Sequence, residues 1–395
     1  MIKRKKKNKE HNPFYDPTLK KRHVSAKRFK KFTLTSLIFS VAFLAFFLFD
    51  MIGKGIPAFN IAYIKVDVTF NEKTLEDTRF AVPTEYRNLV SRAALRDLQK
   101  LLEENPTYMN STQNIWILAS SQVDQYIKNH NHNLKDKDIA KVDELYAQGL
   151  IDKKFNAIFF ENGDSKIPEY AGIFSAVIGS ILTLIITMAV AFPIGVMTAI
   201  YLEEFAGDNK FTRFIEININ NLAAIPSILF GLLGLAIFIN LFGMPRSSPL
   251  VGGLTLALMT LPIIIVSSRA ALRAVPDSIR QAGYGLGLNK IQVTRDHVLP
   301  LAFPGIMTGS IIGLAQAMGE TAPLIIIGMI AFIPDAPSMV TQAATVMPAQ
   351  LFTWAGMPEG MYIEKTAAGI LVLLTILISL NAIAIYLRKK LEVKW

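Results

Sequence analysis

Thirty-three consecutive residues, 170–202, carry no charge, and most of them are apolar. An α-helix rises 1.5 Å per residue, so about 20 apolar residues cross the hydrocarbon core of a bilayer. A run of 33 therefore predicts a transmembrane helix that is tilted, kinked or longer than the bilayer is thick. Pro193 marks the expected kink. With 51% hydrophobic and 18% charged residues, the whole chain is too apolar for an ordinary soluble protein of this size.

Five further apolar stretches bring the expected number of transmembrane helices to six. They cover residues 32–52, 222–244, 250–268, 299–334 and 366–387. The fold class that follows is a mostly α, polytopic membrane protein. Residues 170–390 are expected to hold five of the six helices, with a polar loop at 273–300 between the fourth and the fifth.

Basic residues gather at three places that six spans put on one side of the membrane. Residues 1–31 hold thirteen Lys or Arg against two acidic residues, a net charge of +11 that accounts for the whole excess of the chain. The other two clusters follow the fourth and sixth spans, at Arg269, Arg273, Arg280, Arg388, Lys389 and Lys390. The positive-inside rule predicts that both termini, including residues 391–395, are cytoplasmic and that the protein lies in the cytoplasmic (inner) membrane. The basic tail is expected to contact membrane lipid, and no nucleic acid is expected as a partner.

Residues 53–169 have the composition of a soluble domain, with fifteen basic and seventeen acidic residues. They follow the first span, so we expect them on the outer face as a small α+β insert. Alternating apolar residues predict a strand at 61–70, and further strands are predicted at 114–119 and 156–161. Helices are predicted at 86–104 and 138–148. His130 and His132 lack further ligands at metal spacing, so no metal site and no cofactor are expected.

The polar segment 280–300 predicts two short helices separated by a break. Pro276 and Asp277 suit a helix start. Gly287 is expected to end the first helix, and Asn289 followed by Gln292 matches a capping box for the second. The second helix is expected to end at the proline that closes the segment.

This segment resembles the EAA loop of ABC-importer permeases, the cytoplasmic coupling helix that docks on a separate ATP-hydrolysing subunit. The matching residues are Gln281, Ala282, Gly283, Gly287, Leu299 and Pro300. The family form usually has Glu where this chain has Gln281. Small side chains at the glycines are expected to let the partner approach the helix backbone. The other interpretation is a polar hairpin that only connects two spans.

Glu320 is the one charge deep in a predicted span, and the flanking Gly319 and Pro323 both disturb a helix. A carboxylate inside a bilayer costs several kcal/mol unless it is paired, protonated or beside water. One interpretation puts Glu320 on a substrate path, where it is protonated and donates to an anion. In the other interpretation, Glu320 forms a structural hydrogen bond between helices.

Residues 317–324, Ala-Met-Gly-Glu-Thr-Ala-Pro-Leu, closely resemble the signature of PstA-type permeases, membrane subunits of the bacterial phosphate-specific ABC importer. The likeness extends over residues 170–390, including 224–232 and 275–280. It implies the ABC-importer permease fold and import of phosphate by alternating access. It also implies a path lined by Glu320, Gln316, Thr321 and Arg269. Many relatives carry Arg at the place of Gln316.

The same resemblance implies partners: two copies of an ATP-binding subunit, a second similar permease and an extracytoplasmic phosphate-binding protein. The chain has no G-x-x-x-x-G-K-[ST] loop to hold nucleotide phosphates, so it is expected to be a transport subunit and no enzyme. Two alternatives remain open. One is a permease for another substrate, such as phosphonate or molybdate, and the other is a membrane-anchored sensor whose insert 53–169 binds a ligand.

Overall fold

The computed structural model describes residues 18–71, 74, 77–330 and 332–391. The chain forms two compact units, Met1–Gly53 and Lys54–Trp395. In the first unit, helix α1 begins at Leu19 and runs to Gly55, just past the unit boundary. It starts earlier than the predicted span because lysine and arginine are good helix formers. Most of its apolar side chains are exposed, as a lipid-facing helix requires.

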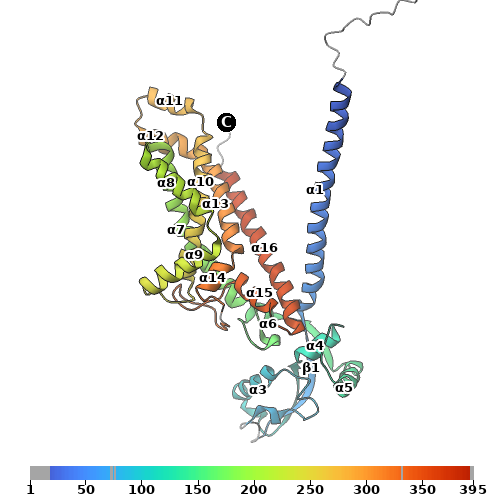
Figure 1. Ribbon diagram of the computed structural model, residues 1–395. Coiled ribbons are helices and arrows are strands. Elements are labelled where there is room, and N and C mark those ends of the chain that lie inside the picture. Colours follow the sequence, from blue (N-terminus) through green and yellow to red (C-terminus); the bar gives the residue numbers. More distant parts are fainter. Residues whose placement is uncertain (1–17, 72–73, 75–76, 331, 392–395) are drawn as a thin grey trace, which may run out of the picture. The chain divides into compact units, whose positions relative to one another are not determined.

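Four long helical segments form the centre of the second unit (Figure 1). They are α7 (Phe174–Ile200) with the π-turn η5 (Tyr201–Phe205), α10 (Pro249–Arg273), α12 (Lys290–Val293) with η7 (Thr294–Val298) and α13 (Leu299–Gly319), and α16 (Gly360–Leu391). Helix α10 packs between α7 and α13. Glycines make these contacts close: Gly253 lies against Ile186 of α7, and Gly313 of α13 lies against Thr260.

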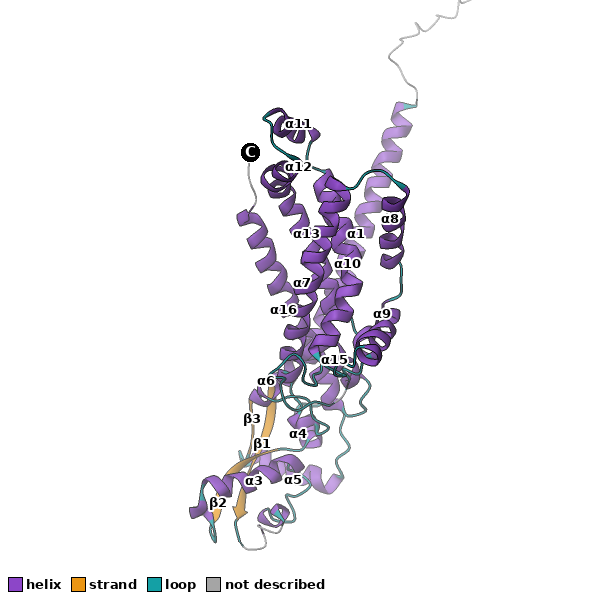
Figure 2. Ribbon diagram, turned by 90° about the vertical axis from the view of Figure 1, so that its left-hand side faces the viewer, coloured by secondary structure: helices purple, strands orange, loops and turns teal. Residues whose placement is uncertain are grey.

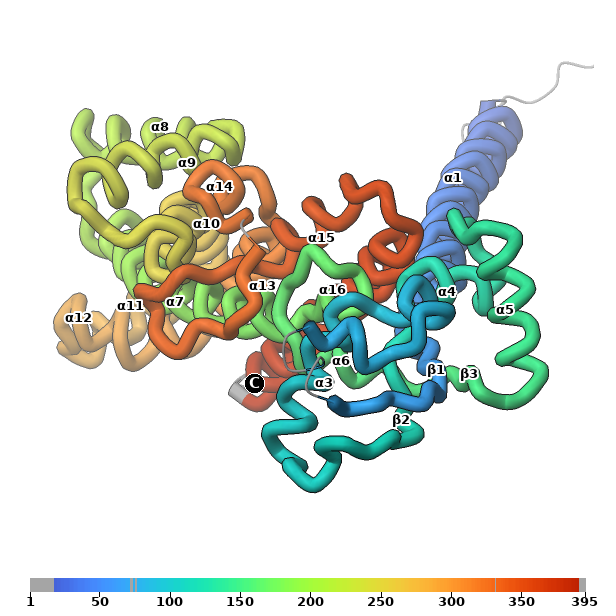
Figure 3. The backbone as a smooth tube through the Cα atoms, turned by 90° about the horizontal axis from the view of Figure 1, so that it is seen from below, coloured from blue at the N-terminus to red at the C-terminus, as the bar shows by residue number. Residues whose placement is uncertain are grey.

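The third crossing is a bent pair of helices, and the predicted single span at 222–244 is wrong. Helix α8 (Lys210–Ala223) is followed by α9 (Ser227–Gly234) and the π-turn η6 (Leu235–Leu241), and the two parts meet at 103°. Pro226 causes the break, because it lacks an N–H and disfavours a helical residue before it. Helix α9 lies against α14 (Ala322–Ile326), as Figure 3 shows.

The bent pair has to cross the full thickness of the helical layer. Two contacts show that helices α7 and α10 run parallel. Thr187 Oγ1 donates to the Gly253 carbonyl (3.2 Å), and Glu203 pairs with Arg269 (3.3 Å) further along both helices. The chain must therefore return between them. Among the described residues five helices are long and apolar enough to cross a membrane by length and composition, and the bent pair raises the number to six.

The fifth span also differs from the prediction at both ends. It is one helical segment, Lys290–Gly319, which passes through Pro300 without a break. The π-turn η7 just before this proline already interrupts the regular hydrogen bonding, so the missing N–H costs little. The helix then ends at Gly319, whereas 299–334 was predicted, and Glu320 is extended, with φ −75° and ψ 128°.

A three-stranded antiparallel sheet lies at the end of the second unit away from α11 (Figure 2). The strand order is β2-β1-β3, with β1 at Asn60–Thr69, β2 at Thr112–Leu118 and β3 at Ile151–Phe155. We call residues 56–170 around these strands the sheet region. Its helices are η1 (Ile56–Phe59), η2 (Thr78–Ala81), α3 (Arg92–Glu104), η3 (Pro106–Tyr108), α4 (Ser121–Ile127), α5 (Asp136–Ala147), α6 (Ala157–Glu161) and η4 (Pro168–Tyr170).

The core of the sheet region follows the alternation of β1. Ile64, Val66 and Val68 are buried, whereas the residues between them face outward. The strand predicted at 156–161 is wrong: β3 ends at Phe155, and α6 follows because the Asn156 side chain caps it by accepting from the Phe159 N–H. Helix α3 starts at Arg92, later than predicted, with Ser91 as its cap.

Two buried charged residues at the start of α16 fasten this helix to the sheet region. The Lys365 ammonium group donates to the carbonyls of Pro168 and Ala171, each at 2.6 Å. The Glu364 carboxylate accepts from Lys128 at 3.1 Å and also contacts His130. Because buried charges are costly unless paired, these contacts define one arrangement of helix and sheet region. The sequence analysis missed them. A Glu-Lys pair directly before an apolar span was the available signal.

Candidate coupling site

The polar segment between α10 and α13 folds as a hairpin of two helices. Helix α11 occupies Asp277–Gly285, with Pro276 at the cap position. The chain turns back at Gly287, whose φ of +82° favours glycine. Asn289 and Gln292 then form the predicted capping box, with both side-chain to backbone hydrogen bonds at 2.9 Å. We call residues 276–298 the coupling hairpin.

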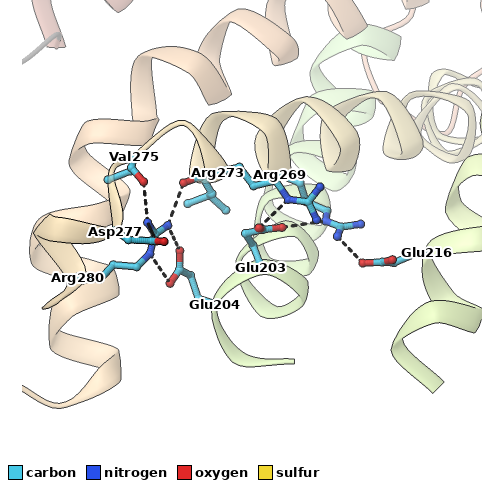
Figure 4. A network of polar contacts seen from close by, with 9 residues as sticks. Glu203, Glu204, Glu216, Arg269, Arg273, Val275, Asp277 and Arg280 are labelled. Atoms are coloured by element: carbon cyan, nitrogen blue, oxygen red, sulfur yellow. Dashed lines mark hydrogen bonds and ion pairs between the residues drawn. The ribbon is translucent and has the colours of Figure 1, made fainter. Parts of the chain in front are cut away.

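Arg280 anchors α11 to the end of α7 (Figure 4). Its guanidinium group makes a bidentate contact with Glu204, at 2.7 Å from Nη2 and 3.3 Å from Nε. It also donates to the carbonyls of Val275 (2.7 Å) and Leu272 (3.0 Å), which satisfies the last turn of α10. The Glu204 side chain is only 4% exposed, so this carboxylate depends on the arginine for compensation.

A second pair of arginines ties α10 to two other helices. Arg269 contacts Glu203 of η5 at 3.3 Å and also pairs with Glu216 of α8, while Arg273 contacts the other oxygen of Glu203 at 2.7 Å (Figure 4). The ends of α7, α8 and α10 are therefore joined by charge pairs. Together with Arg280 and Glu204, these residues form what we call the arginine–glutamate network.

Arg280 keeps its positive charge over the physiological pH range, because its hydrogen bond to Glu204 raises its pKa above the already high ordinary value. This guanidinium group therefore does not release a proton in a catalytic step. The arrangement suits a mechanical connection, in which movement of the coupling hairpin moves α7 and α10 with it.

The outward face of the coupling hairpin exposes apolar side chains among polar ones. Gln281 and Ala282 are exposed, and Leu286 and Ile291 expose 81% and 63% of their surfaces. Apolar side chains this exposed on a polar segment mark an interaction surface.

The predicted glycines of the coupling hairpin play different parts. A Cβ atom at Gly283 would lie 2.8 Å from Val293, so this glycine lets α11 pack on α12. Its predicted role in partner approach is therefore wrong. Gly285 and Gly287 face open space. Leu299 and Pro300 are half-buried in the long helix that follows, outside the turn itself.

The predicted path residues are not brought together. Glu320 and Thr321 are half-buried beyond the end of α13, and Gln316 is exposed one turn earlier. Gly309 packs against Ser267, so Arg269 lies more than about 15 Å from Glu320 along the helix axis. Arg269 belongs to the arginine–glutamate network instead. Among the described residues the Glu320 carboxylate has no ion-pair or hydrogen-bond partner, and Arg269 contacts Glu203 instead.

Sequence reasoning also missed the acidic half of the network. The sequence analysis gave no role to Glu203, Glu204 or Glu216. The available signal was charge complementarity: a group of carboxylates that includes these three follows the second span, and Arg269, Arg273 and Arg280 follow the fourth. Spacing along the chain does not show that these groups meet.

The His130 and His132 pair is occupied by protein contacts. His130 Nδ1 contacts Glu364, and the His132 ring packs edge-on against Tyr126 with centroids 4.9 Å apart. In the part of the chain that the structure describes, no three His, Asp or Glu side chains group as metal ligands would.

Comparison with known proteins identifies two family models. The model of the binding-protein-dependent transport system inner membrane component matches residues 191–393. A model described as a domain of unknown function matches residues 16–86 and 81–136.

Several curated relatives are similar to part of the chain. The chain is 36% identical over 160 residues to the phosphate transport system permease protein PstA of Mycobacterium leprae, covering 40% of this chain and 52% of that protein. It is 33% identical over 168 residues to the probable ABC transporter permease protein YqgI of Bacillus subtilis. This match covers 42% of this chain and 56% of that protein. The chain thus spans about half the length of these relatives. The chain is also 30% identical over 245 residues to the PstA protein of Yersinia pestis, a match that covers 61% of this chain and 81% of that protein.

A solved structure of the MetNI methionine ABC transporter in an inward-facing conformation matches with a TM-score of 0.45 and 16% identity. The match covers 56% of this chain and 98% of that one.

Proposed function

The chain belongs to the family of binding-protein-dependent transport system inner membrane components, and we propose that it is the membrane permease subunit of an ATP-driven importer of inorganic phosphate. The observation that carries the proposal is the similarity to PstA proteins, and the Gly319–Pro323 segment of the sequence and the coupling hairpin of the fold agree with it. Alternating access of the helical layer would move phosphate across the cytoplasmic membrane.

The proposed partners follow from this role. Two copies of an ATP-binding subunit would bind this permease and a second, similar one, and an extracytoplasmic protein would deliver phosphate. The sheet region would then lie outside the cell, and the coupling hairpin and both termini inside. We propose the domain boundaries accordingly, with a basic tail at 1–31, a first span at 32–52, an outer domain at 53–169 and the permease at 170–390.

The coupling hairpin would receive the motion of the ATP-binding subunit through Gln281, Ala282 and the exposed Leu286. Arg280 and Glu204 would pass this motion to α7, and Arg269 and Glu203 would pass it between α7 and α10. Buried charge pairs suit this task, because they hold one geometry and are costly to break.

The position of Glu320 supports a role on the substrate path. It follows the break at Gly319, where the chain leaves the helix and frees backbone groups. With no described ion-pair partner, the carboxylate can meet a passing ion or a residue of the second permease. Gln316 and Thr321 lie beside it in sequence and would share this path.

Reconstitution tests the proposal. The permease pair and the ATP-binding subunit are placed in vesicles, the binding protein is added outside, and uptake of radiolabelled phosphate is measured with and without internal ATP. We expect ATP-dependent uptake that excess unlabelled phosphate abolishes. Inhibition by phosphonate or molybdate at lower concentration than phosphate would identify one of these as the substrate. Ligand binding without uptake would favour a membrane-anchored sensor.

A further inference from the structure

The sheet region contains a cavity of about 640 Å³ with an unusual charge. Among the described residues, four arginines line it, Arg79, Arg87, Arg92 and Arg96, together with the acidic Asp77. The volume falls within the range of small-molecule sites, about 300 to 1,000 Å³. An adjoining cavity of about 540 Å³ shares Arg87 and Arg92 in its wall.

Two of these arginines are held in place by the fold. The Nε atom of Arg87 donates to the Val82 carbonyl (3.1 Å), and its guanidinium group lies 5.3 Å from the ring centroid of Phe80. Arg79 is paired with Asp77, with Nη2 at 2.6 Å from the carboxylate. The charge of Asp77 is thus shared between Arg79, which it contacts, and Arg87, which lies near enough to lower its pKa.

The other two arginines are placed where their charges repel. Arg92 and Arg96 lie four residues apart on one face of α3, and like charges at this spacing destabilise a helix. Arg92 is also the first residue of α3, next to the positive end of the helix dipole. Among the described residues neither arginine has an ion-pair partner, and the nearby Asp97 accepts a hydrogen bond from the Tyr170 hydroxyl instead. A bound anion would relieve both costs.

We propose that this arginine cavity is a binding site for a phosphate-type oxyanion, free or carried by a small organic molecule. Guanidinium groups bind phosphate oxygens through paired, charge-assisted hydrogen bonds, and converging groups from two helical segments and a turn can surround such a group. The site lies on the sheet region, apart from the helical path and the coupling hairpin. The inference goes beyond transport, because it assigns a ligand to a part of the chain that transport alone does not require.

Calorimetric titration of the full-length protein in nanodiscs tests this inference. Inorganic phosphate, tripolyphosphate and glycerol phosphate are the probes, at low ionic strength. The double variant Arg92→Gln/Arg96→Gln should bind the tightest-binding probe about tenfold more weakly or worse. Each charged hydrogen bond contributes about a factor of ten to the affinity. Lys100→Gln, on the same helix but outside the cavity, is the matched control and should leave affinity unchanged.

The three probes separate the sources of the ligand. Arginine-dependent binding of free phosphate identifies an inorganic ligand, and preference for the ester or for tripolyphosphate identifies an organic or extended one. Binding that is absent from the native protein, or equal in the native protein and the double variant, overturns the inference. Tighter binding of citrate than of any phosphate also overturns it.

A second readout guards against a folding defect. The bound anion should raise the unfolding temperature of the native protein and of Lys100→Gln, and leave that of the double variant unchanged. The variant's unfolding temperature without ligand should match that of the native protein or exceed it, because a repulsive pair has been removed. Phosphate uptake is measured separately, so a failure of this site is distinguishable from a failure of the transport proposal.

Discussion

Arg280 shows how much a single residue contributes to the candidate site. It joins the distant carboxylate of Glu204 to two neighbouring features, the end of α10 and the first turn of α11. A lysine could not replace it. The planar guanidinium fork of arginine donates to several acceptors at once, whereas a single ammonium group cannot reach them all.

Replacing Arg280 with methionine should uncouple the coupling hairpin. The change leaves Glu204 buried without compensation, which costs about 3 to 5 kcal/mol. We expect lower thermal stability and loss of the ATP hydrolysis stimulated by substrate in the reconstituted complex. Arg213→Met is the control, since Arg213 lies on α8 outside the coupling hairpin, is exposed and pairs with the exposed Asp208 at 3.5 Å. Equal hydrolysis in both variants would exclude the proposed role.

Replacing Glu320 with glutamine should impair phosphate uptake. The substitution keeps the shape and removes the charge, so it tests the carboxylate and leaves the break at Gly319 in place. Uptake by reconstituted vesicles is the measurement, with the double variant Gln316→Glu/Glu320→Gln as a second test that shifts the charge by one helical turn. Full uptake by the glutamine variant would favour a structural hydrogen bond.

Asp164 gives the stability of the protein a pH dependence of known sign. Burial raises the pKa of this carboxyl to about 6, although Trp354 donates to it at 2.8 Å. The folded protein then holds the Asp164 proton more tightly than the unfolded chain does. The protonated carboxyl group therefore stabilises the fold fully below about pH 4, and this stabilisation is lost as pH rises to about 6. Asp164→Asn should flatten the change of unfolding temperature over this window. An identical profile in both proteins would contradict the assignment.

At the scale of elements, interruptions of the helices matter as much as the helices themselves. Pro226 produces the 103° bend in the third crossing, Gly319 ends the fifth span before Glu320, and Gly287 reverses the coupling hairpin. Each break places a functional segment at the edge of the helical layer.

Replacing Gly287 with valine should distort the coupling hairpin and leave the rest folded. A β-branched residue at φ +82° is strained by about 1 to 3 kcal/mol, although a side chain there meets no neighbour within 4 Å. Substrate-stimulated ATP hydrolysis should fall while the unfolding temperature changes little. Gly285→Ala, at a position with equal space and no positive φ, should behave as the native protein does. Unchanged stimulation in the valine variant would remove the coupling role.

At the scale of the second unit, the sheet region and α16 form one structure. Lys128 is the central cation: it pairs with Asp124 at 2.6 Å and with Glu364 at 3.1 Å, and its side chain is only 6% exposed. Burial raises the pKa of Asp124, and Lys128 opposes that shift. The sheet region is therefore connected to a helix of the proposed permease by more than a linker.

Replacing Lys128 with methionine should loosen this connection. Two buried carboxylates lose their shared partner, at a cost of about 3 to 5 kcal/mol. Limited proteolysis should then cut faster between the sheet region and α7 than in the native protein. Lys137→Met, at an exposed position of α5, should be cut at the native rate. Adding Glu364→Gln to the Lys128 variant should restore part of the resistance.

The amino-acid sequence by itself determined the apolar spans, the fold class and the local signals of the coupling hairpin. These depend on composition and on neighbours a few residues apart, as the Asn289–Gln292 capping box illustrates. Tertiary structure decided which distant residues meet. In the folded chain Arg269 contacts Glu203 and Glu216 and lies far from Glu320, because α7 and α10 run parallel. It also buried Lys365 beneath the sheet region, since only packing in three dimensions brings three backbone carbonyls to one ammonium group.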